Sequence, residues 1–229
     1  MLVERGLLDR AGELLREVSA PGMAAIVSDD TVYALYGERT VKALEKAGYR
    51  VHSFTFPAGE GSKNLSTYAD VLHFLGEHRF SRSDVVVALG GGVVGDLAGF
   101  AASIYMRGID FINCPTTTLS MIDSSIGGKT AVDLGDTKNI VGAFWQPKLV
   151  IVDPNTLATL PRRHFINGLA EAVKASLLAD PELFAIFENG DVDAQIGEII
   201  CRSLRFKKNI VEQDETEQGM RKALNFGHT

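Results

Sequence analysis

The chain has 229 residues, of which 45% are hydrophobic and 23% are charged, a globular composition that argues against a disordered or fibrous protein. At about 150 residues per domain, this length allows one large or two small domains. The 29 acidic and 23 basic residues give a net charge of −6. This charge argues against nucleic-acid binding, which relies on a basic surface, but leaves open a small anionic substrate at a locally basic site.

The sequence predicts a soluble protein that has no membrane partner. Charged residues interrupt the first 20 positions, where a signal peptide would need an apolar stretch. No run reaches the roughly 18 apolar residues that a membrane helix requires. Two cysteines are too few for a disulfide framework. We therefore expect a cytoplasmic location with reduced thiols.

In chain order, short apolar runs alternate with helical patterns and then give way to helices alone. We expect strands at 23–28, 50–56, 84–89, 110–113 and 148–152, and helices at 31–48, 65–75 and from about 90–95 to 104. Such alternation is typical of a parallel α/β sheet. Past residue 161 the pattern predicts only helices, at 169–178, 183–187, 196–211 and 219–228. We therefore expect an α/β domain at 1–158 and the start of a helical domain at 159–229.

The run from Asp84 to Leu89 is followed by a glycine-rich turn, Gly90-x-Gly92-x-x-Gly95. Glycines between a strand and a helix let the backbone approach a pyrophosphate, which the helix N-terminus then binds. The turn follows the third predicted strand, however, whereas the dinucleotide fingerprint follows the first. A tight turn needed only for packing stays open as the alternative.

Two polar segments follow the next predicted strand. The hydroxyls of Thr116, Thr117 and Thr118 suit a cofactor ribose or phosphate, although such hydroxyls alone are more often an ordinary helix N-cap. The sequence Gly127-Gly128-Lys129-Thr130 resembles the end of a P-loop, but Asp123 stands where that motif needs glycine. We therefore reject triphosphate binding and expect a loop that brings a cation to an anionic substrate. Lys138 and Asn139 would add a second cation and an amide.

Polar residues also share helical faces in the C-terminal part. Glu171 and Lys174 are three residues apart among small apolar neighbours, so we expect a partly buried pair rather than the alternative, a surface ion pair. Arg221, Asn225 and His228 have the spacing of one helical face. Such a stripe suits an anion site beside a metal, with a solvated polar face as the alternative.

In combination these segments resemble the 3-dehydroquinate synthase family over nearly the whole chain. The resemblance rests on ordered motifs: GExxKNL at 59–65, GGGVVGDLAGFAAS at 90–103, YMRG at 105–108, PTT at 115–117, DSSIGGKTAVD at 123–133, KNIVGAFWQP at 138–147, TLP at 159–161, GLAEAVK at 168–174, Lys207, Asp214-Glu215 and RKALNFGHT at 221–229. The resemblance implies a Rossmann-like parallel-sheet domain that binds NAD, an all-helical domain that binds metal, and an active site between the two domains.

The resemblance also implies an activity. Family members use NAD catalytically, with a divalent metal, usually zinc or else cobalt, to convert 3-deoxy-D-arabino-heptulosonate 7-phosphate into 3-dehydroquinate and phosphate in the shikimate pathway. The wider family includes cyclases that act on other sugar phosphates. A homodimer is expected because Arg107 matches an arginine that reaches across a dimer interface toward the phosphate.

Individual positions carry the family's roles over to this sequence. Two match metal ligands: Glu171 and His228. Positions that match NAD contacts are Asp29, Glu60, Lys63, Gly91, Gly92, Asp96, Thr116, Thr117, Lys129, Lys138 and Thr159. Positions that match the substrate site are Asp123, Lys129, Asn139, Lys174, Lys207, Arg221 and Asn225. Cations suit a substrate that bears both a carboxylate and a phosphate.

One departure from the family pattern concerns the metal. The family has further histidines, including a third ligand, and a phosphate-site lysine at positions that would fall after Thr229. Because catalytic zinc sites normally use three protein ligands, we expect these 229 residues alone to bind NAD weakly and not to turn over. A related sugar-phosphate cyclase and a non-catalytic NAD-binding module stay open as alternatives.

Overall fold

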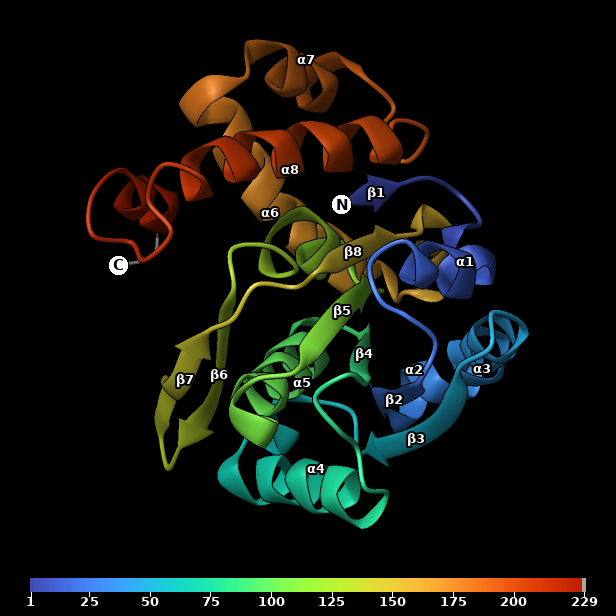
Figure 1. The fold of residues 1–229 in the computed structure, drawn as a ribbon. Helices are drawn as coiled ribbons and strands as arrows, with labels where there is room; N and C mark the ends of the chain where they lie inside the picture. Colours follow the sequence, from blue (N-terminus) through green and yellow to red (C-terminus); the bar gives the residue numbers. More distant parts are fainter. Residues whose placement is uncertain (228–229) are drawn as a thin grey trace.

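A computed structural model describes residues 1–227, which are built around a six-stranded parallel sheet in the order β1-β8-β5-β4-β2-β3 (Figure 1). The strands are β1 (Leu2–Val3), β2 (Met23–Asp29), β3 (Arg50–Phe56), β4 (Val85–Gly90), β5 (Asp110–Pro115) and β8 (Leu149–Val152). Every neighbouring pair is parallel. The predicted α/β class and the five predicted strands are confirmed.

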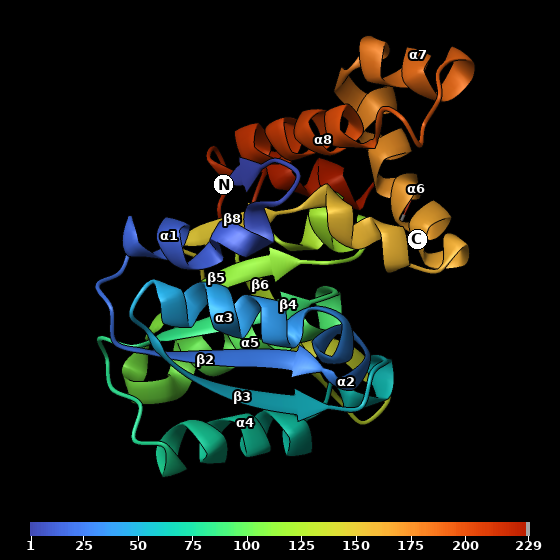
Figure 2. The same ribbon diagram turned by 90° about the vertical axis from the view of Figure 1, so that its right-hand side faces the viewer.

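Both faces of the sheet are covered, which explains why the central strands are continuously apolar (Figure 2). In β2, Ala24 and Ile26 pack toward α1 (Ala11–Arg16) and α3 (Glu38–Lys46). Ala25 and Val27 point the other way. That second face is covered by α4 (Leu65–Glu77) and α5 (Gly92–Ile104).

The connections after β2 and after β3 lie on opposite faces of the sheet. After β2 the chain turns through α2 (Asp30–Val32), a π-helical turn (Tyr33–Gly37) and α3, and then pairs on one side of β2 as β3. After β3 it crosses by α4 to the other side of β2 and becomes β4. The strand order therefore reverses between β2 and β4, and parallel sheets bind ligands in the crevice at such a point.

An antiparallel hairpin stands apart from the main sheet: β6 (Lys129–Leu134) and β7 (Thr137–Phe144) (Figure 1). It packs against α5 through Val132, which is fully buried. The sequence prediction missed both strands, because it interpreted this polar stretch as a loop that carries Lys129 and Asn139. The available signal was the two-residue turn Gly135-Asp136, a sequence that is typical of a β-hairpin.

The C-terminal part is helical, as predicted, with α6 (Arg162–Ala179), α7 (Pro181–Asn189) and α8 (Ile196–Val211). Its core also includes Val150 and Val152 of β8, so this part packs directly on the sheet. The division at residues 158 and 159 stays a prediction. No helix within residues 1–227 is both long enough and apolar enough to cross a membrane.

The predicted helix at 219–228 is wrong in kind. In the described part of this segment a short 3-10 helix forms, at Met220–Asn225, and Gly219 before it is not helical. A 3-10 helix has three residues per turn, so positions four apart point in different directions. Arg221 is accordingly buried, whereas Asn225 is exposed. His228 lies outside the described residues.

Candidate active site

A cleft of about 610 Å³ lies among the β6–β7 hairpin, the turn after β5 and the C-terminal helices. All seven side chains that the sequence predicts for the substrate site line it: Asp123, Lys129, Asn139, Lys174, Lys207, Arg221 and Asn225. Asp96 of α5 lines the same cleft, so a predicted cofactor residue adjoins the predicted substrate residues. The apolar side chains of Ile140 and Phe144 on β7 complete the wall.

Lys207 comes from the middle of α8 and pairs with Asp123. Its Nζ donates to the Asp123 carboxylate at 2.7 Å and to the Asp123 backbone carbonyl at 2.9 Å. Asp123 belongs to a π-helical turn, Ser120–Ser124, that follows β5, and such turns are frequent at functional sites. The Lys207 side chain is only 11% exposed. A buried ammonium needs a partner of this kind, because an unpaired charge is costly to bury.

Arg221 occupies a slot that the backbone builds for it. The guanidinium donates to the carbonyl of Gly127 at 2.8 Å and to the carbonyl of Glu215, and it lies 5.8 Å from the ring of Phe144. A Cβ on Gly127, whose φ is +97°, would come within 2.5 Å of the Arg221 Nη2. Glycine is therefore required there for both conformation and space. Arg221 is 1% exposed, so its position is set by the fold.

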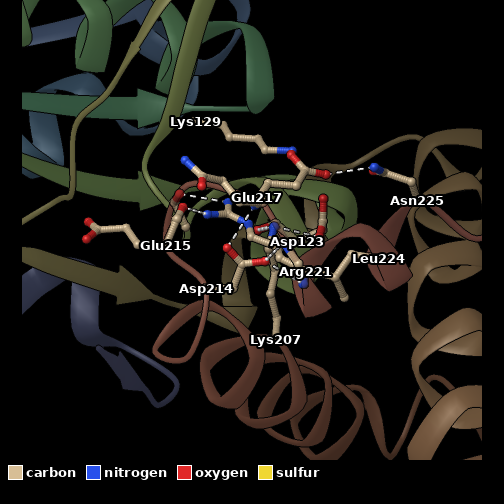
Figure 3. Close-up of polar contacts among 12 residues, drawn as sticks. Asp123, Lys129, Lys207, Asp214, Glu215, Glu217, Arg221, Leu224 and Asn225 are labelled. Atoms are coloured by element: carbon tan, nitrogen blue, oxygen red, sulfur yellow. Dashed lines mark hydrogen bonds and ion pairs between the residues drawn. The ribbon is translucent and has the colours of Figure 1, made fainter.

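Glu217 joins two of the predicted substrate residues (Figure 3). Its carboxylate forms an ion pair with Lys129 and accepts from the amide of Asn225 at 2.7 Å. Burial opposes ionisation, but the hydrogen bonds from Lys129 and Asn225 prevail and lower the pKa of Glu217. An ionised carboxylate of the protein therefore sits between two groups that would otherwise face a ligand.

The predicted pair of Glu171 and Lys174 forms on α6, with side chains that are 16% and 12% exposed. The Lys174 Nζ also donates to the backbone carbonyl of Leu224 at 2.5 Å. Glu171 is one of two predicted metal ligands, and His228, the other, lies outside the described residues. Within residues 1–227 no group of three or more metal-binding side chains comes together. The described residues alone therefore do not form a metal centre.

The carboxyl ends of β4 and β5 form a cradle of glycine backbone and threonine hydroxyls. Gly91 caps α5 in an extended conformation, and a Cβ there would lie 3.0 Å from Thr117. A Cβ on Gly92, the first residue of α5, would lie 3.2 Å from Ser124. The Thr116 Oγ1 is buried without a hydrogen-bond partner within the described residues. The free helix N-terminus, bare backbone and unpaired hydroxyl together suit a phosphate-bearing ligand.

The alternative interpretations of these segments hold only in part. Thr117 behaves as an N-cap, because its Oγ1 accepts from the backbone N–H of Ser120 at 3.2 Å. Gly95 serves packing, since a Cβ there would approach the Asn113 side chain to 3.1 Å. Neither role explains the orphan hydroxyl of Thr116.

Two further predicted NAD residues lie at the same edge of the sheet. Asp29 ends β2 and caps α2 by accepting from the Val32 N–H at 2.8 Å, and burial raises its pKa. Thr159 follows β8, and its hydroxyl is 2.6 Å from that of Tyr36. Both therefore flank the crevice where the strand order reverses.

A buried ion pair connects this edge to the hairpin. Lys63, after β3, pairs with Asp96 of α5 and donates to the Asn139 side chain at 2.5 Å. Burial raises the pKa of Asp96 to about 6, and Lys63 opposes that rise only in part. A second, exposed pair joins Lys138 to Glu60 at 3.0 Å. Predicted cofactor and substrate residues thus share one network.

Arg107, which was expected to reach toward the phosphate across a dimer interface, does not line this cleft. It is exposed in a short turn before β5, with a left-handed φ of +65°. α5 starts at the carboxyl edge of the sheet and returns the chain to the opposite edge. Arg107 therefore does not reach the cleft of its own chain.

Comparison with known proteins now decides the family. Residues 53–167 match the 3-dehydroquinate synthase N-terminal family, and residues 168–229 match the 3-dehydroquinate synthase C-terminal family. This chain belongs to the 3-dehydroquinate synthase family. The 3-dehydroquinate synthase of Enterococcus faecalis strain ATCC 47077 / OG1RF is 47% identical over 233 residues, which are 100% of this chain and 65% of that protein.

Other relatives agree in extent. The 3-dehydroquinate synthase of Streptococcus pneumoniae serotype 19F (strain G54) is also 47% identical, over 99% of this chain and 65% of its own length. The chain thus spans 65% of the length of these two 3-dehydroquinate synthases, which is slightly less than two thirds.

Solved structures of similar fold hold the expected cofactors. A 2-epi-5-epi-valiolone synthase from Streptomyces hygroscopicus subsp. jinggangensis 5008, with NAD+ and Zn2+ bound, is 33% identical at a TM-score of 0.89, over 99% of this chain and 65% of its own. A 2-deoxy-scyllo-inosose synthase complexed with carbaglucose-6-phosphate, NAD+ and Co2+ is 28% identical at a TM-score of 0.88, over 98% of this chain and 62% of its own.

Sequence reasoning missed several residues of the site. Glu217, Asp214 and Gly127 hold predicted residues in place but were not among the candidates. The available signals were the motifs DSSIGGKTAVD and Asp214-Glu215, which contain Gly127 and Asp214, and for Glu217 its place shortly before RKALNFGHT. Acidic residues in a turn are usually solvated, so nothing in their type marked them as part of a site.

Proposed function

We propose that this chain forms the NAD-binding and part of the substrate-binding machinery of a 3-dehydroquinate synthase. The reaction converts 3-deoxy-D-arabino-heptulosonate 7-phosphate into 3-dehydroquinate and phosphate. One observation carries the proposal: four cationic side chains line a single cleft, beside the glycine-rich N-terminus of α5 and the unpaired Thr116 hydroxyl. The curated relatives named 3-dehydroquinate synthase support it.

The cleft cations would bind the two anionic groups of the substrate. Lys207 and Arg221 are nearly buried, so they offer strong, directional donors to a carboxylate or a phosphate. Lys174 and Lys129 add two further ammonium groups, and Asn139 and Asn225 add amides for hydroxyl groups. The number of donors in the cleft favours a substrate with two anionic groups over one with a phosphate alone.

The cradle would hold NAD. Gly91, Gly92 and the α5 N-terminus would bind its pyrophosphate, and Thr116 would use its unpaired hydroxyl. When bound, NAD supplies reversible oxidation of a substrate hydroxyl. Asp96, with a pKa near 6, lies at the junction of cradle and cleft. It could therefore accept or return a proton near neutral pH, which suits a group beside a hydroxyl that is oxidised.

Three further parts of the proposal rest on the family alone. A divalent metal, zinc or cobalt, would be held by Glu171 together with His228. The protein would act as a homodimer, in which the exposed Arg107 serves the partner's cleft. Its location would be cytoplasmic.

Phosphate release tests the function. The whole protein that carries these residues should release phosphate from the heptulosonate phosphate when NAD and zinc are added. Glucose 6-phosphate and sedoheptulose 7-phosphate lack the carboxylate and should be poor substrates. Preferred turnover of either would instead favour a related cyclase. Tight NAD binding without turnover of any of the three would favour a non-catalytic NAD-binding module.

The 229 residues alone form a separate case. We expect them to bind NAD weakly and to release no phosphate in the same assay. Robust turnover by this chain would contradict that prediction while leaving the proposed reaction intact.

A further inference from the structure

Asp214 lies in the turn after α8 and accepts hydrogen bonds from three backbone amides (Figure 3). One carboxylate oxygen accepts from the N–H of Gln218 at 2.9 Å. The other accepts from Gly219 at 2.7 Å and from Arg221 at 3.0 Å. These amides, that of Arg221 first, lower the pKa of Asp214, so the carboxylate stays ionised at neutral pH. One side chain thereby closes residues 214–221 into a loop that ends at Arg221.

The loop depends on this carboxylate because its own backbone contributes little. The N–H of Glu217 is 3.5 Å from the carbonyl of Asp214, which is long for a hydrogen bond. Glu217 also has a left-handed φ of +61°, a conformation that a non-glycine residue rarely adopts without support. Within residues 1–227, the amides of Gln218 and Gly219 have the Asp214 carboxylate as their acceptor and no other.

Arg221 in turn needs a fixed backbone. Its guanidinium reaches the carbonyls of Gly127 and Glu215 in a slot so narrow that a Cβ on Gly127 would collide with it. Arg221 also lines the substrate cleft, whereas Asp214 is not among the described residues that line it. The Asp214 carboxylate is therefore placed to act on the cleft through Arg221.

We propose that Asp214 is a positioning residue, which holds the backbone of Arg221 so that the guanidinium presents its donors to the anionic substrate. The inference rests on the proposed function for the identity of that substrate. Removal of the carboxylate should free the loop, widen the range of Arg221 positions and weaken substrate binding, with little effect on the NAD cradle.

Hydrogen exchange tests the structural half of the proposal. Asp214→Ala should speed exchange of the Gln218, Gly219 and Arg221 amides by about 10-fold or more, the loss expected for a charge-assisted hydrogen bond. Asp214→Asn keeps one acceptor oxygen and should fall between this variant and the wild type. The control is Glu212→Gln, which removes a nearby carboxylate that pairs with Lys208 instead. Circular dichroism of each variant establishes that it is folded.

Kinetics test the functional half in the whole protein. Asp214→Ala should raise the KM for the heptulosonate phosphate by about 10-fold, change kcat less, and leave the NAD affinity within about 2-fold. In an Arg221→Ala background the same change should have almost no further effect, because the two residues act as one unit. If the increases in KM of the two single variants instead multiply in the double variant, the proposal is overturned.

A failure of the proposed function can be distinguished from a failure of the positioning role of Asp214. If the wild-type protein neither binds nor turns over the heptulosonate phosphate, the proposed function fails. The exchange of the three amides then decides the positioning role alone, and unchanged exchange in Asp214→Ala overturns it.

Discussion

Asparagine in place of Asp96 should remove a specific part of the pH dependence of stability. The Asp96 side chain is 17% exposed, and burial raises its pKa from 3.8 to about 6 despite the ion pair with Lys63. The folded protein therefore holds this proton more tightly than the unfolded chain does. The stabilisation is fully present below the unfolded pKa and is lost as the pH rises through about 6.

The size of the effect follows from the difference between the two pKa values. At about 1.4 kcal/mol per pH unit, the full difference is worth about 3 kcal/mol, of which about 2 kcal/mol disappears between about pH 4.5 and pH 7. Asparagine cannot ionise. The free energy of unfolding of Asp96→Asn, minus that of the wild type, should therefore rise by about 2 kcal/mol over this range. Groups with lowered pKa values, such as Asp180, act equally in both proteins and cancel.

Urea unfolding, followed by circular dichroism at both pH values, measures this difference. Carbon-13 NMR of the Asp96 carboxyl gives its titration midpoint independently. Asp70→Asn, which removes an exposed carboxylate from α4, is the matched control and should show no such trend. A stability difference between the wild type and Asp96→Asn that is the same at both pH values, or a midpoint near 4, would refute the reasoning.

Three further changes test other parts of the structure. Gly127→Ala should displace Arg221 and weaken heptulosonate phosphate binding by about 10-fold in calorimetry, with NAD binding unchanged. Glu217→Gln frees Lys129 and should tighten inorganic phosphate binding at neutral pH. In the wild type, protonation of Glu217 frees Lys129 in the same way, so its affinity for phosphate should rise as the pH falls through the lowered pKa of Glu217, whereas the affinity of the variant should not. Arg202→Ala removes a side chain that pairs with three carboxylates on and beside α7 and α8, so the unfolding temperature should fall, and about 1 M salt should shrink the difference.

The sheet was predictable because burial on two faces leaves a clear trace in sequence. The run at 85–89 is apolar throughout and forms β4, a strand with neighbours on both sides. The hairpin was not predictable by that route, since β6 and β7 carry Lys129, Lys138 and Asn139 among their residues. Where polar residues serve the cleft, they hide the alternation that marks a strand.

The candidate site likewise contains residues that could be predicted from the sequence and residues that could not. Residues at the carboxyl ends of parallel strands meet at one edge of the sheet, so Asp29, Gly91 and Thr116 could be grouped once the family resemblance had marked them. Asp214 and Glu217 could not, because their partners are backbone amides and side chains that only the folded turn brings near. Arg221 shows the limit most directly. It was expected in the site, but the helical face invoked for it does not exist, and a 3-10 turn with a backbone slot places it there.

The cleft holds its cations with the protein's own acceptors, and this arrangement bears on specificity. Lys207 is held by Asp123 and Lys174 by Glu171, which stabilises nearly buried charges in the absence of a ligand. Each ammonium has three N–H donors and a guanidinium has five, so Lys207, Lys174 and Arg221 keep donors to spare after these contacts. The carboxylates also offset much of the positive charge, so a stray anion gains little from the cleft. A ligand must instead meet several remaining donors at once, which favours a molecule that carries two anionic groups at a fixed separation.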